Sequence, residues 1–223
     1  MKKVRIGSKN LPAWLVLLAG LITAMGLGTL GYILWHWGPH RWGVVEPGRI
    51  YRSGLLRPGH VKQVLADNHI GVVISLCPRN PKDARDVALE KAVEELGIEI
   101  QRFPMHGNGT PNDGTINWHV AAVAAIVQAR KEGKPVLVQC AAGVQRTGGV
   151  VATYQLLVER KSPQEVYAEM CRHKFNAARN PKLLEFLNRH MKDIAEKLVS
   201  LGVIEDVPAV ATIPGEAGEA QNP

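Results

Sequence analysis

The N-terminal part of the chain carries one long apolar run. No Asp, Glu, Lys or Arg occurs between Lys9 and Arg41, and residues 11–35 exceed the roughly 20 apolar residues that a helix needs to cross a bilayer. Its aromatic residues lie near the two ends, as they do in membrane helices: Trp14, Tyr32, Trp35 and Trp37. The pattern predicts one transmembrane helix over residues 11–37, preceded by a basic N-terminal flank over residues 1–10.

Two other interpretations fit this run less well. A signal peptide has a shorter apolar core, of about 7–15 residues, and then small residues at a cleavage site, whereas this run ends in bulky aromatic residues. A buried helix of a globular domain is rarely apolar on all sides over such a length. The four basic residues before the run outnumber Arg41 and Arg49 after it, which favours a cytoplasmic N-terminus. Arg52 and Arg57 reduce this asymmetry, so the side of the membrane on which the following domain lies stays open.

From residue 44 onwards, short apolar runs alternate with segments of helical periodicity. The β-branched or alternating runs predict strands over 48–54, 70–77, 98–105 and 135–140. Helical periodicity, with capping and stop signals, predicts helices over 58–69, 80–97, 115–133, 146–160, 162–173 and 180–202. This alternation predicts an α/β domain over residues 44–202, with a central, mostly parallel sheet flanked by helices. Residues 203–223 show no helical period, and we expect a disordered tail there.

Charge and cysteine content narrow the functional classes. The net charge is +7, and the four bases of the N-terminal flank balance the four acids of the tail, so the middle of the chain carries the whole excess. Such a domain favours anionic partners. Three cysteines, Cys77, Cys140 and Cys171, without a C-x-x-C spacing argue against a disulfide scaffold and a zinc site, and leave room for a reactive thiol. We therefore expect no metal or other cofactor.

The segment VQCAAGVQRTG, residues 138–148, combines features of an anion site. Cys140 ends a predicted buried strand and Arg146 begins a predicted helix, so the loop between them lies where α/β sheets bind ligands and where a helix presents free N–H groups. Gly143 allows the loop to curl around an anion, and Arg146 can bind two of its oxygens. The same field lowers the pKa of Cys140, and a thiolate beneath a bound phosphoryl group is an in-line nucleophile.

We therefore predict that the loop binds a phosphate group and that Cys140 attacks it. The Thr147 hydroxyl is placed to donate to the sulfur and help it leave. The predicted phosphate-binding residues are Ala141, Ala142, Gly143, Val144, Gln145 and Arg146.

The motif Cys140-Ala-Ala-Gly-Val-Gln-Arg146-Thr147-Gly148 resembles that of the cysteine-based (C-x5-R) phosphatase superfamily, most closely its dual-specificity-like, atypical tyrosine phosphatase branch. The resemblance spans about residues 44–200 and includes the segment IYRSG. It implies a dual-specificity phosphatase-like fold and hydrolysis of phosphomonoesters through a phosphocysteine, without a metal. The implied substrates are phosphoproteins, on Tyr or Ser/Thr, or phosphorylated lipids or small molecules. We expect no nucleic-acid partner, and a bilayer partner through residues 11–37.

Two positions depart from the family pattern. Gln139 stands where the family usually has a histidine, which helps to hold the loop and tune the thiol, so we expect a higher thiol pKa and slower chemistry. Gln145 stands where some lipid-directed relatives carry an aspartate, so the general acid has to come from elsewhere. The family commonly supplies it from a loop about thirty residues upstream, and Asp113, with His106 as second choice, is the candidate.

Other polar residues have simpler interpretations. Asp83 and Asp86 suit a helix N-terminus. We expect surface charge rather than a place at the mouth of the site for Arg79, Arg52 and His60. Cys77 ends the strand next to that of Cys140, which suits either a buried side chain or a protective disulfide.

Two functions remain as alternatives to a phosphatase. A catalytically weak phosphate-binding pseudophosphatase would agree with Gln139 and with the open identity of the acid. A rhodanese-type sulfurtransferase also places a cysteine loop before a helix, but the sequence that follows Cys140 argues against it.

Overall fold

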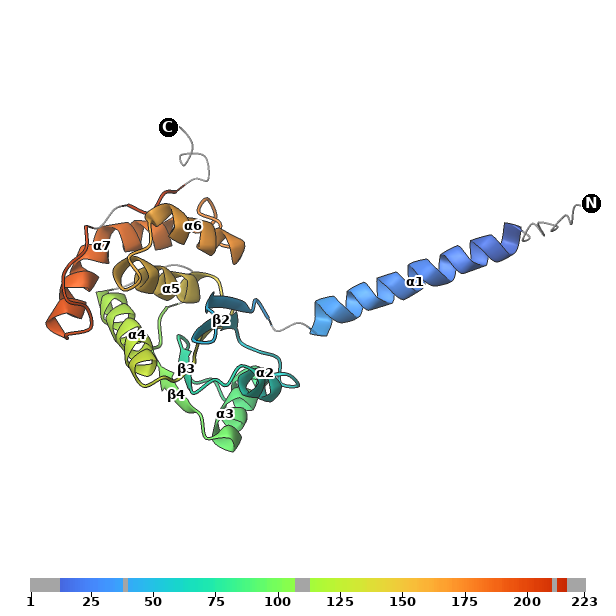
Figure 1. Cartoon of the computed structure of the whole chain (residues 1–223), viewed down its shortest axis with the longest axis horizontal. Coiled ribbons are helices and arrows are strands. Elements are labelled where there is room, and N and C mark those ends of the chain that lie inside the picture. The colour runs from blue at the N-terminus through green and yellow to red at the C-terminus, as the bar shows by residue number, and fades with distance from the viewer. Residues whose placement is uncertain (1–12, 38–39, 107–112, 210–211, 216–223) are drawn as a thin grey trace, which may run out of the picture. The chain divides into compact units, whose positions relative to one another are not determined.

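The computed structural model of the chain describes residues 13–37, 40–106, 113–209 and 212–215 (Figure 1). The chain divides into two units, Met1–Gly38 and Pro39–Pro223. In the first, helix α1 runs from Ala13 to Trp37, and its described side chains, those of residues 17–29, are exposed. Within the described residues, no helix combines the length and the apolar character that crossing a membrane would need. The transmembrane helix expected over residues 11–37 extends beyond them and stays a prediction.

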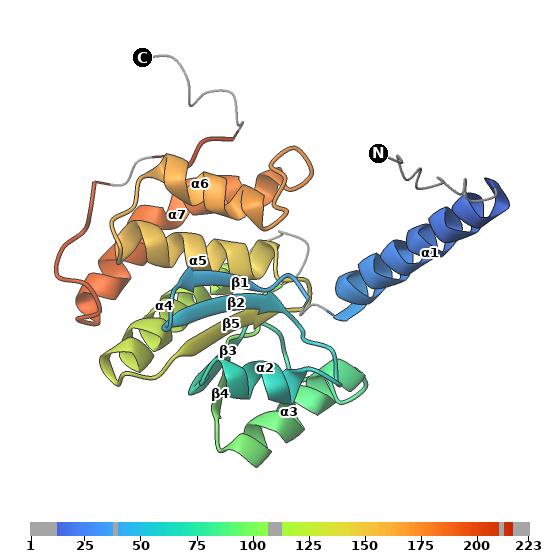
Figure 2. The ribbon, with the colours of Figure 1, turned by 45° about the vertical axis from the view of Figure 1, so that its right-hand side comes forward.

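The second unit is built on a five-stranded sheet with the order β1-β2-β5-β3-β4 (Figure 2). The strands are β1 (Gly43–Glu46), β2 (Ile50–Gly54), β3 (Val72–Ser75), β4 (Glu99–Arg102) and β5 (Val136–Cys140). All neighbours are parallel except β1, which pairs antiparallel with β2 at one edge. The predicted α/β fold is confirmed, with a mixed sheet. The pattern did not predict β1, because four residues are too few to show a strand period.

Helices cover both faces of this sheet (Figure 2). One side packs against α2 (Val61–Asp67) and α3 (Ala84–Leu96), and the larger core lies on the other side. That side carries α4 (Asp113–Lys131), α5 (Gln145–Leu157), α6 (Pro163–Arg172) and α7 (Pro181–Ser200).

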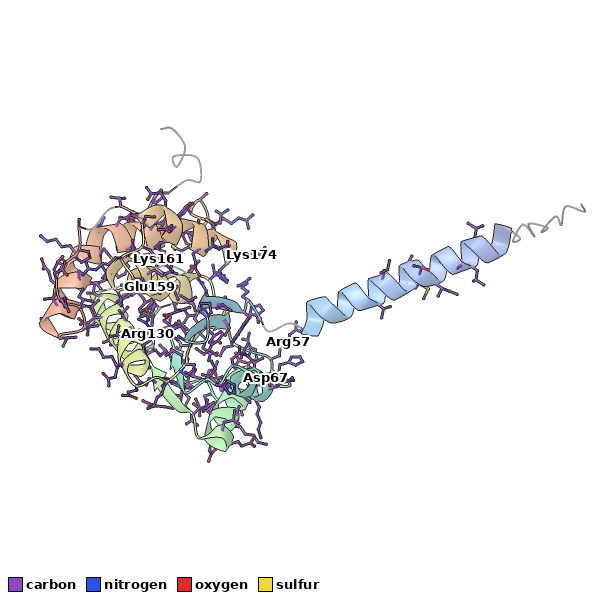
Figure 3. All side chains as sticks on the ribbon, viewed as in Figure 1. Arg57, Asp67, Arg130, Glu159, Lys161 and Lys174 are labelled. Atoms are coloured by element: carbon purple, nitrogen blue, oxygen red, sulfur yellow. The ribbon has the colours of Figure 1, made fainter. Side chains whose placement is uncertain are left out.

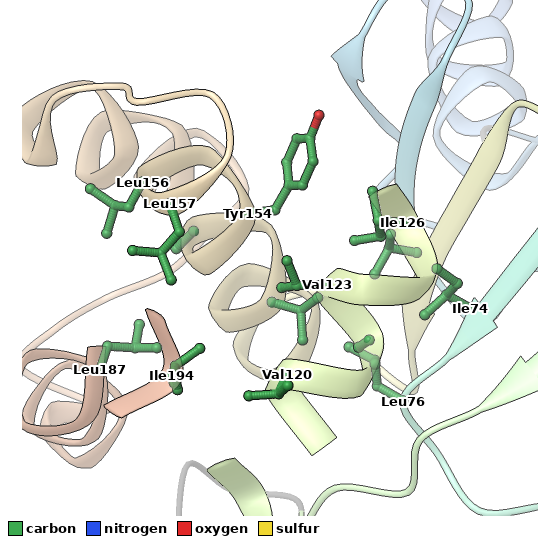
Figure 4. Packing of buried hydrophobic residues seen from close by; sticks show 14 of the residues in the cluster. Ile74, Leu76, Val120, Val123, Ile126, Tyr154, Leu156, Leu157, Leu187 and Ile194 are labelled. Carbon is green, nitrogen blue, oxygen red and sulfur yellow. The ribbon is translucent and has the colours of Figure 1, made fainter. Parts of the chain in front are cut away.

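Helix α5 lies in the middle of the larger core. Every residue from Thr147 to Leu157 is buried. Figure 4 shows Tyr154 and Leu157 of this helix among side chains of β3, α4 and α7, including Ile74, Val123 and Leu187. A helix enclosed on all sides has little freedom to move, so its first turn is a rigid support for the loop that precedes it.

The helix ends follow the signals in the sequence. Asp83 caps α3 by accepting the backbone N–H of Arg85, Asp86 lies in the first turn, and Gly97 closes the helix in the left-handed region. Ser162 and Glu165 form a capping box at the start of α6. The structural interpretation of Asp83 and Asp86 is thus confirmed.

The described part of the C-terminal tail packs onto the domain, although we expected residues 203–223 to be disordered. Ile204 and Ile213 are buried in the larger core. The side chain of Asn188 in α7 donates to the carbonyl of Ile213 and accepts its N–H, at 3.1 and 2.9 Å. Two isolated isoleucines carry no periodic signal, so sequence periodicity could not reveal this contact.

A buried histidine in the core makes the stability of the fold depend on pH. His119 of α4 is 2% exposed and lies 3.2 Å, Nδ1 to Oγ1, from Thr153 of α5. Burial lowers the pKa of His119 to about 4. Because its pKa in the unfolded chain is about 6.5, the neutral ring stabilises the fold above that pH, and this contribution is lost as the pH falls from about 6.5 to 4.

We predict that the free energy of unfolding falls by about 2 kcal/mol between pH 7 and pH 5 because of His119 alone. Urea unfolding at the two pH values would measure it. The variant His119→Gln keeps a polar side chain but cannot titrate, so its stability should change less over this range. An equal loss in the variant would rule out His119 as the cause.

Candidate active site

The predicted nucleophile lies at the carboxyl edge of the sheet. Cys140 is the last residue of the central strand β5, opposite Gly54 of β2, and is 2% exposed. Helix α5 begins five residues later at Gln145. The loop between strand and helix is therefore short, and both of its ends are held by buried elements.

Gly143 makes this tight loop sterically feasible. Its φ is +71°, in the left-handed region that favours glycine. A Cβ at this position would collide with the backbone of Ser53 and Gly54 at the end of β2. The loop thus packs directly on the neighbouring strand, and only glycine allows that approach.

Three consecutive carbonyl groups of the loop are held by groups from the N-terminal half of the domain. The N–H of Leu55 donates to the carbonyl of Ala141 at 3.3 Å. The Arg41 guanidinium donates to that of Ala142 at 2.7 Å, and the Arg52 guanidinium to that of Gly143 at 3.0 Å.

These bonds fix where the amide hydrogens point. In a planar trans peptide the N–H of the next residue points opposite to the carbonyl. The N–H groups of Ala142, Gly143 and Val144 therefore turn away from these three donors, and we call this set the anion cradle. One of them is directly engaged, because the N–H of Gly143 donates to Sγ of Cys140 at 3.2 Å.

The surroundings of Cys140 favour its thiolate. Burial raises the pKa of the thiol, but interactions with the Thr147 hydroxyl and N–H, the Arg146 guanidinium and the Gly143 N–H outweigh it and hold the pKa below its usual range. The Thr147 hydroxyl is buried and has no nitrogen or oxygen partner among the described residues, so it is free to donate a hydrogen bond to Sγ of Cys140. Two of the predicted catalytic residues, Arg146 and Thr147, therefore interact with the third, Cys140, and lower its pKa.

Arg146 is anchored across the strand ends. Its Nη1 donates to the carbonyls of Leu76, just after β3, and Met105, beyond β4, both at 3.3 Å. These bonds leave its other guanidinium nitrogens available for an anion. The structure thus places a fixed cation beside the thiol.

Within the described part of the chain, the side chain of Gln139 makes no hydrogen bond that would hold the loop. It is fully buried, and neither its amide nitrogen nor its amide oxygen has a hydrogen-bond partner among the described residues. Successive strand residues face opposite sides of a sheet, so its side chain lies on the face away from that of Cys140. The pKa of the thiol is lowered by Thr147, Arg146 and the Gly143 N–H instead.

The predicted general acid lies at the border of the described chain. Asp113 is the first residue of α4, and its side chain lies outside the described residues, as do residues 107–112. His106 is exposed and directly follows Met105, whose carbonyl holds Arg146. The choice of Asp113 stays a prediction.

Cys77, two residues beyond the end of β3, contacts the loop. Both Cys77 and Cys140 are free thiols, and Sγ of Cys77 accepts the N–H of Ala141 at 3.1 Å. Burial raises the pKa of Cys77, and the nearby Arg146 offsets this only in part. This arrangement agrees with the interpretation of Cys77 as a buried strand-end residue.

The expectation of surface charge fails at Arg52. Arg79 is indeed exposed and paired with Glu90, and His60 precedes α2. Arg52, however, is 0% exposed and pairs with Glu169. Sequence reasoning missed the roles of Arg41, Arg52 and Glu169. For Arg52 the available signals were the segment IYRSG, which contains it, and the strand period, which puts position 52 on the same face as buried Ile50.

Comparison with known proteins agrees with this geometry. The family model described as "Dual specificity phosphatase, catalytic domain" matches residues 56–193. No curated protein matches the chain by sequence.

Solved structures share the fold. The core catalytic domain of the PP-IP phosphatase SIW14 from S. cerevisiae, in complex with citrate, has a TM-score of 0.59 at 19% identity, over 74% of this chain and 94% of that one. P. aeruginosa TpbA, as a cysteine-to-serine variant in complex with pTyr, has a TM-score of 0.54 at 19% identity, over 73% and 98%. A putative phosphatase from Shewanella putrefaciens has a TM-score of 0.53 at 23% identity, over 74% and 95%.

We predict that Gly143→Ala weakens binding of inorganic phosphate about tenfold or more, because a left-handed alanine costs about 1–2 kcal/mol and its Cβ would displace the loop from β2. Titration calorimetry of the full chain would measure it. Gly97→Ala is the matched control, because Gly97 has φ +65° with nothing within 4 Å of the added Cβ. It should lower stability by about 1 kcal/mol and leave phosphate binding intact. Equal affinities in both variants would contradict the role of Gly143.

Proposed function

The chain belongs to the dual specificity phosphatase family and is a cysteine-dependent phosphatase, and we propose that it hydrolyses phosphomonoesters through a phosphocysteine formed on Cys140. The observation that carries this proposal is the position of the Cys140 sulfur, which accepts the N–H of Gly143 from the anion cradle and lies in the field of Arg146, so that its pKa is lowered. A buried thiol without such partners would stay protonated and inert.

The first half-reaction transfers the phosphoryl group to sulfur. Arg146 and the cradle hold the phosphate oxygens, and the Cys140 thiolate attacks phosphorus in line with the ester oxygen. The P–O bond breaks, and Asp113 gives its proton to the leaving oxygen.

The second half-reaction returns the enzyme to its starting state. Asp113, now ionised, takes a proton from a water molecule that attacks the phosphocysteine. The P–S bond breaks, the Thr147 hydroxyl donates to the departing thiolate, and inorganic phosphate leaves. Donors that stay in place throughout stabilise the charge in both transition states.

The substrate is a phosphoprotein, on Tyr or Ser/Thr, or a phosphorylated lipid or small molecule. The net charge of +7 supports an anionic substrate. Among the structural neighbours, one is described as a PP-IP phosphatase and another binds pTyr. Both ligand classes carry the phosphate group for which the cradle is suited.

The weaker alternatives have less support. Unpaired Gln139 favours a catalytically weak phosphate-binding protein, but the pKa of Cys140 lies below its usual range without help from that residue. Membership in the phosphatase family argues against a rhodanese-type sulfurtransferase.

We predict that Cys140→Ser lowers phosphatase activity on p-nitrophenyl phosphate by at least about a thousandfold, since an alcohol is not ionised at neutral pH. Asp113→Asn should remove the basic limb of the pH–rate profile. It should also slow hydrolysis of phenyl phosphate more than that of p-nitrophenyl phosphate, whose leaving group needs less protonation.

The control for the acid is His106→Asn, which should keep both limbs of the profile. Activity that survives Cys140→Ser would refute the phosphocysteine. An unchanged profile in Asp113→Asn, together with a lost limb in His106→Asn, would move the acid role to the histidine.

The N-terminal segment holds the phosphatase at a membrane in this proposal. Residues 11–37 would form a single-pass anchor with the N-terminus in the cytoplasm. The absence of Asp, Glu, Lys and Arg between Lys9 and Arg41, and a helix from Ala13 to Trp37, support it.

We predict that the full chain stays in the membrane pellet after extraction with alkaline carbonate, whereas a chain that starts at Pro39 is released. Recovery of the full chain in the supernatant would refute the anchor. Protease protection of a C-terminal tag in sealed vesicles would show on which side the phosphatase domain lies.

A further inference from the structure

Arg52 is unusual among the charged residues of the domain. Most charged side chains point outward, as those of Asp67 and Lys174 do (Figure 3). Arg52 has 0% exposure, and no other lysine or arginine among the described residues is buried. A cation is taken out of water only where its partners compensate, so the partners of Arg52 indicate what it is for.

The guanidinium of Arg52 divides its hydrogen bonds between two elements. Nη1 donates to both carboxylate oxygens of Glu169 in α6, at 2.7 and 2.9 Å. Nη2 donates to the carbonyl of Gly143, at 3.0 Å. Glu169 is itself 5% exposed, and its other neighbour is His173, with Nε2 at 3.5 Å.

We propose that Arg52, held by Glu169, is a positioning residue that orients the Gly143–Val144 peptide of the anion cradle. The proposal rests on the proposed phosphatase function and adds to it two residues that the motif does not contain. Arg52 also lies before residues 56–193, which the family model matches.

The Arg52 guanidinium and the Gly143–Val144 peptide are both planar groups. The guanidinium is flat and its donors diverge at fixed angles, so the grip on Glu169 determines where Nη2 points. The Gly143–Val144 peptide is also flat, so a carbonyl held toward Arg52 turns the N–H of Val144 the opposite way, into the cradle. Glu169 of α6 thus fixes the guanidinium of Arg52, and the guanidinium in turn fixes the direction of the Val144 N–H.

Gly143 needs such a hold more than other residues do. Glycine has access to a wide range of backbone angles, so its φ of +71° is not fixed by its own sterics. The carbonyl of Ala142 is held by Arg41, whose bond is exposed, whereas that of Gly143 is held inside the core. A buried bond is less weakened by water than an exposed one.

A purely structural role for the ion pair makes a different prediction, and paired substitutions separate the two. Replacing both partners of a buried ion pair by apolar residues often preserves stability, whereas removing one partner does not. In Arg52→Met/Glu169→Leu the core would be filled but the Gly143 carbonyl would lose its donor. We expect near-native thermal stability, kcat lower by about 10- to 100-fold, and a raised dissociation constant for inorganic phosphate.

Two single substitutions sharpen the comparison. In Glu169→Gln the amide oxygen still accepts from Arg52, so stability should fall while kcat stays within a few-fold of wild type. In Arg52→Lys the single ammonium group cannot reproduce the fork, so kcat should fall even where the protein is folded. Arg102→Met is the control, because Arg102 pairs with mostly buried Asp86 and its hydrogen bonds within the described residues go to Ser75, Asp86 and Glu90 rather than to a loop carbonyl. It should lower stability without changing kcat or phosphate affinity.

The experiment uses the full chain, with kcat and KM on p-nitrophenyl phosphate well below each melting temperature. Phosphate affinity is measured by calorimetric titration, which needs no turnover. A wild-type chain that binds phosphate but hydrolyses nothing would therefore refute the proposed function and still test Arg52. Wild-type kcat and phosphate affinity in the folded double variant, or in Arg52→Lys, would overturn the positioning role. So would a wild-type chain that binds no phosphate.

Discussion

The outward orientation of three consecutive carbonyl groups, those of Ala141, Ala142 and Gly143, is the constraint on which the rest of the site depends. A loop of a few residues between a strand and a helix would otherwise mix carbonyl and N–H groups on both of its sides, and the carbonyls would repel an anion. Here each carbonyl has a donor on the side of β2. Because β2 is the direct neighbour of β5 in the sheet order, the Gly143 carbonyl faces protein, whereas the bond of Arg41 to the Ala142 carbonyl is exposed. The order of the strands therefore decides which side of the loop presents its N–H groups to an anion.

The same arrangement explains how the thiol is activated although Gln139 contributes no hydrogen bond. Burial alone would keep Cys140 protonated. The opposing influences come from the peptide groups and side chains of its own loop and of the first turn of α5. Since α5 is enclosed by the larger core, these groups need no reorganisation when a charge arrives. Core packing around α5, at a distance from the sulfur, therefore helps to keep the thiol activated.

Elements whose signal lies in one continuous segment could be predicted from the sequence, whereas contacts between distant segments could not. Strand β5, the loop and α5 could be predicted because one continuous segment carries an apolar run, a glycine and a helical period. The pair Arg52–Glu169 could not, since its members lie 117 positions apart and each resembles an ordinary surface charge. The contact of Ile213 with Asn188 was missed because an isolated isoleucine 25 positions away carries no periodic signal. The side chain of Asp113 lies outside the described residues, so its role rests on sequence alone.

Cys140 and Arg146 lie within residues 56–193, which the family model matches, whereas Arg41, Arg52 and Leu55 come before them. A chimaera that joins the matched segment to a foreign N-terminal segment would contain the nucleophile without the donors of Arg41, Arg52 and Leu55. Such a transplant could fold and still bind anions poorly. To transfer this active site to another protein, residues 41–55, which carry the three donors, would have to be moved together with residues 56–193.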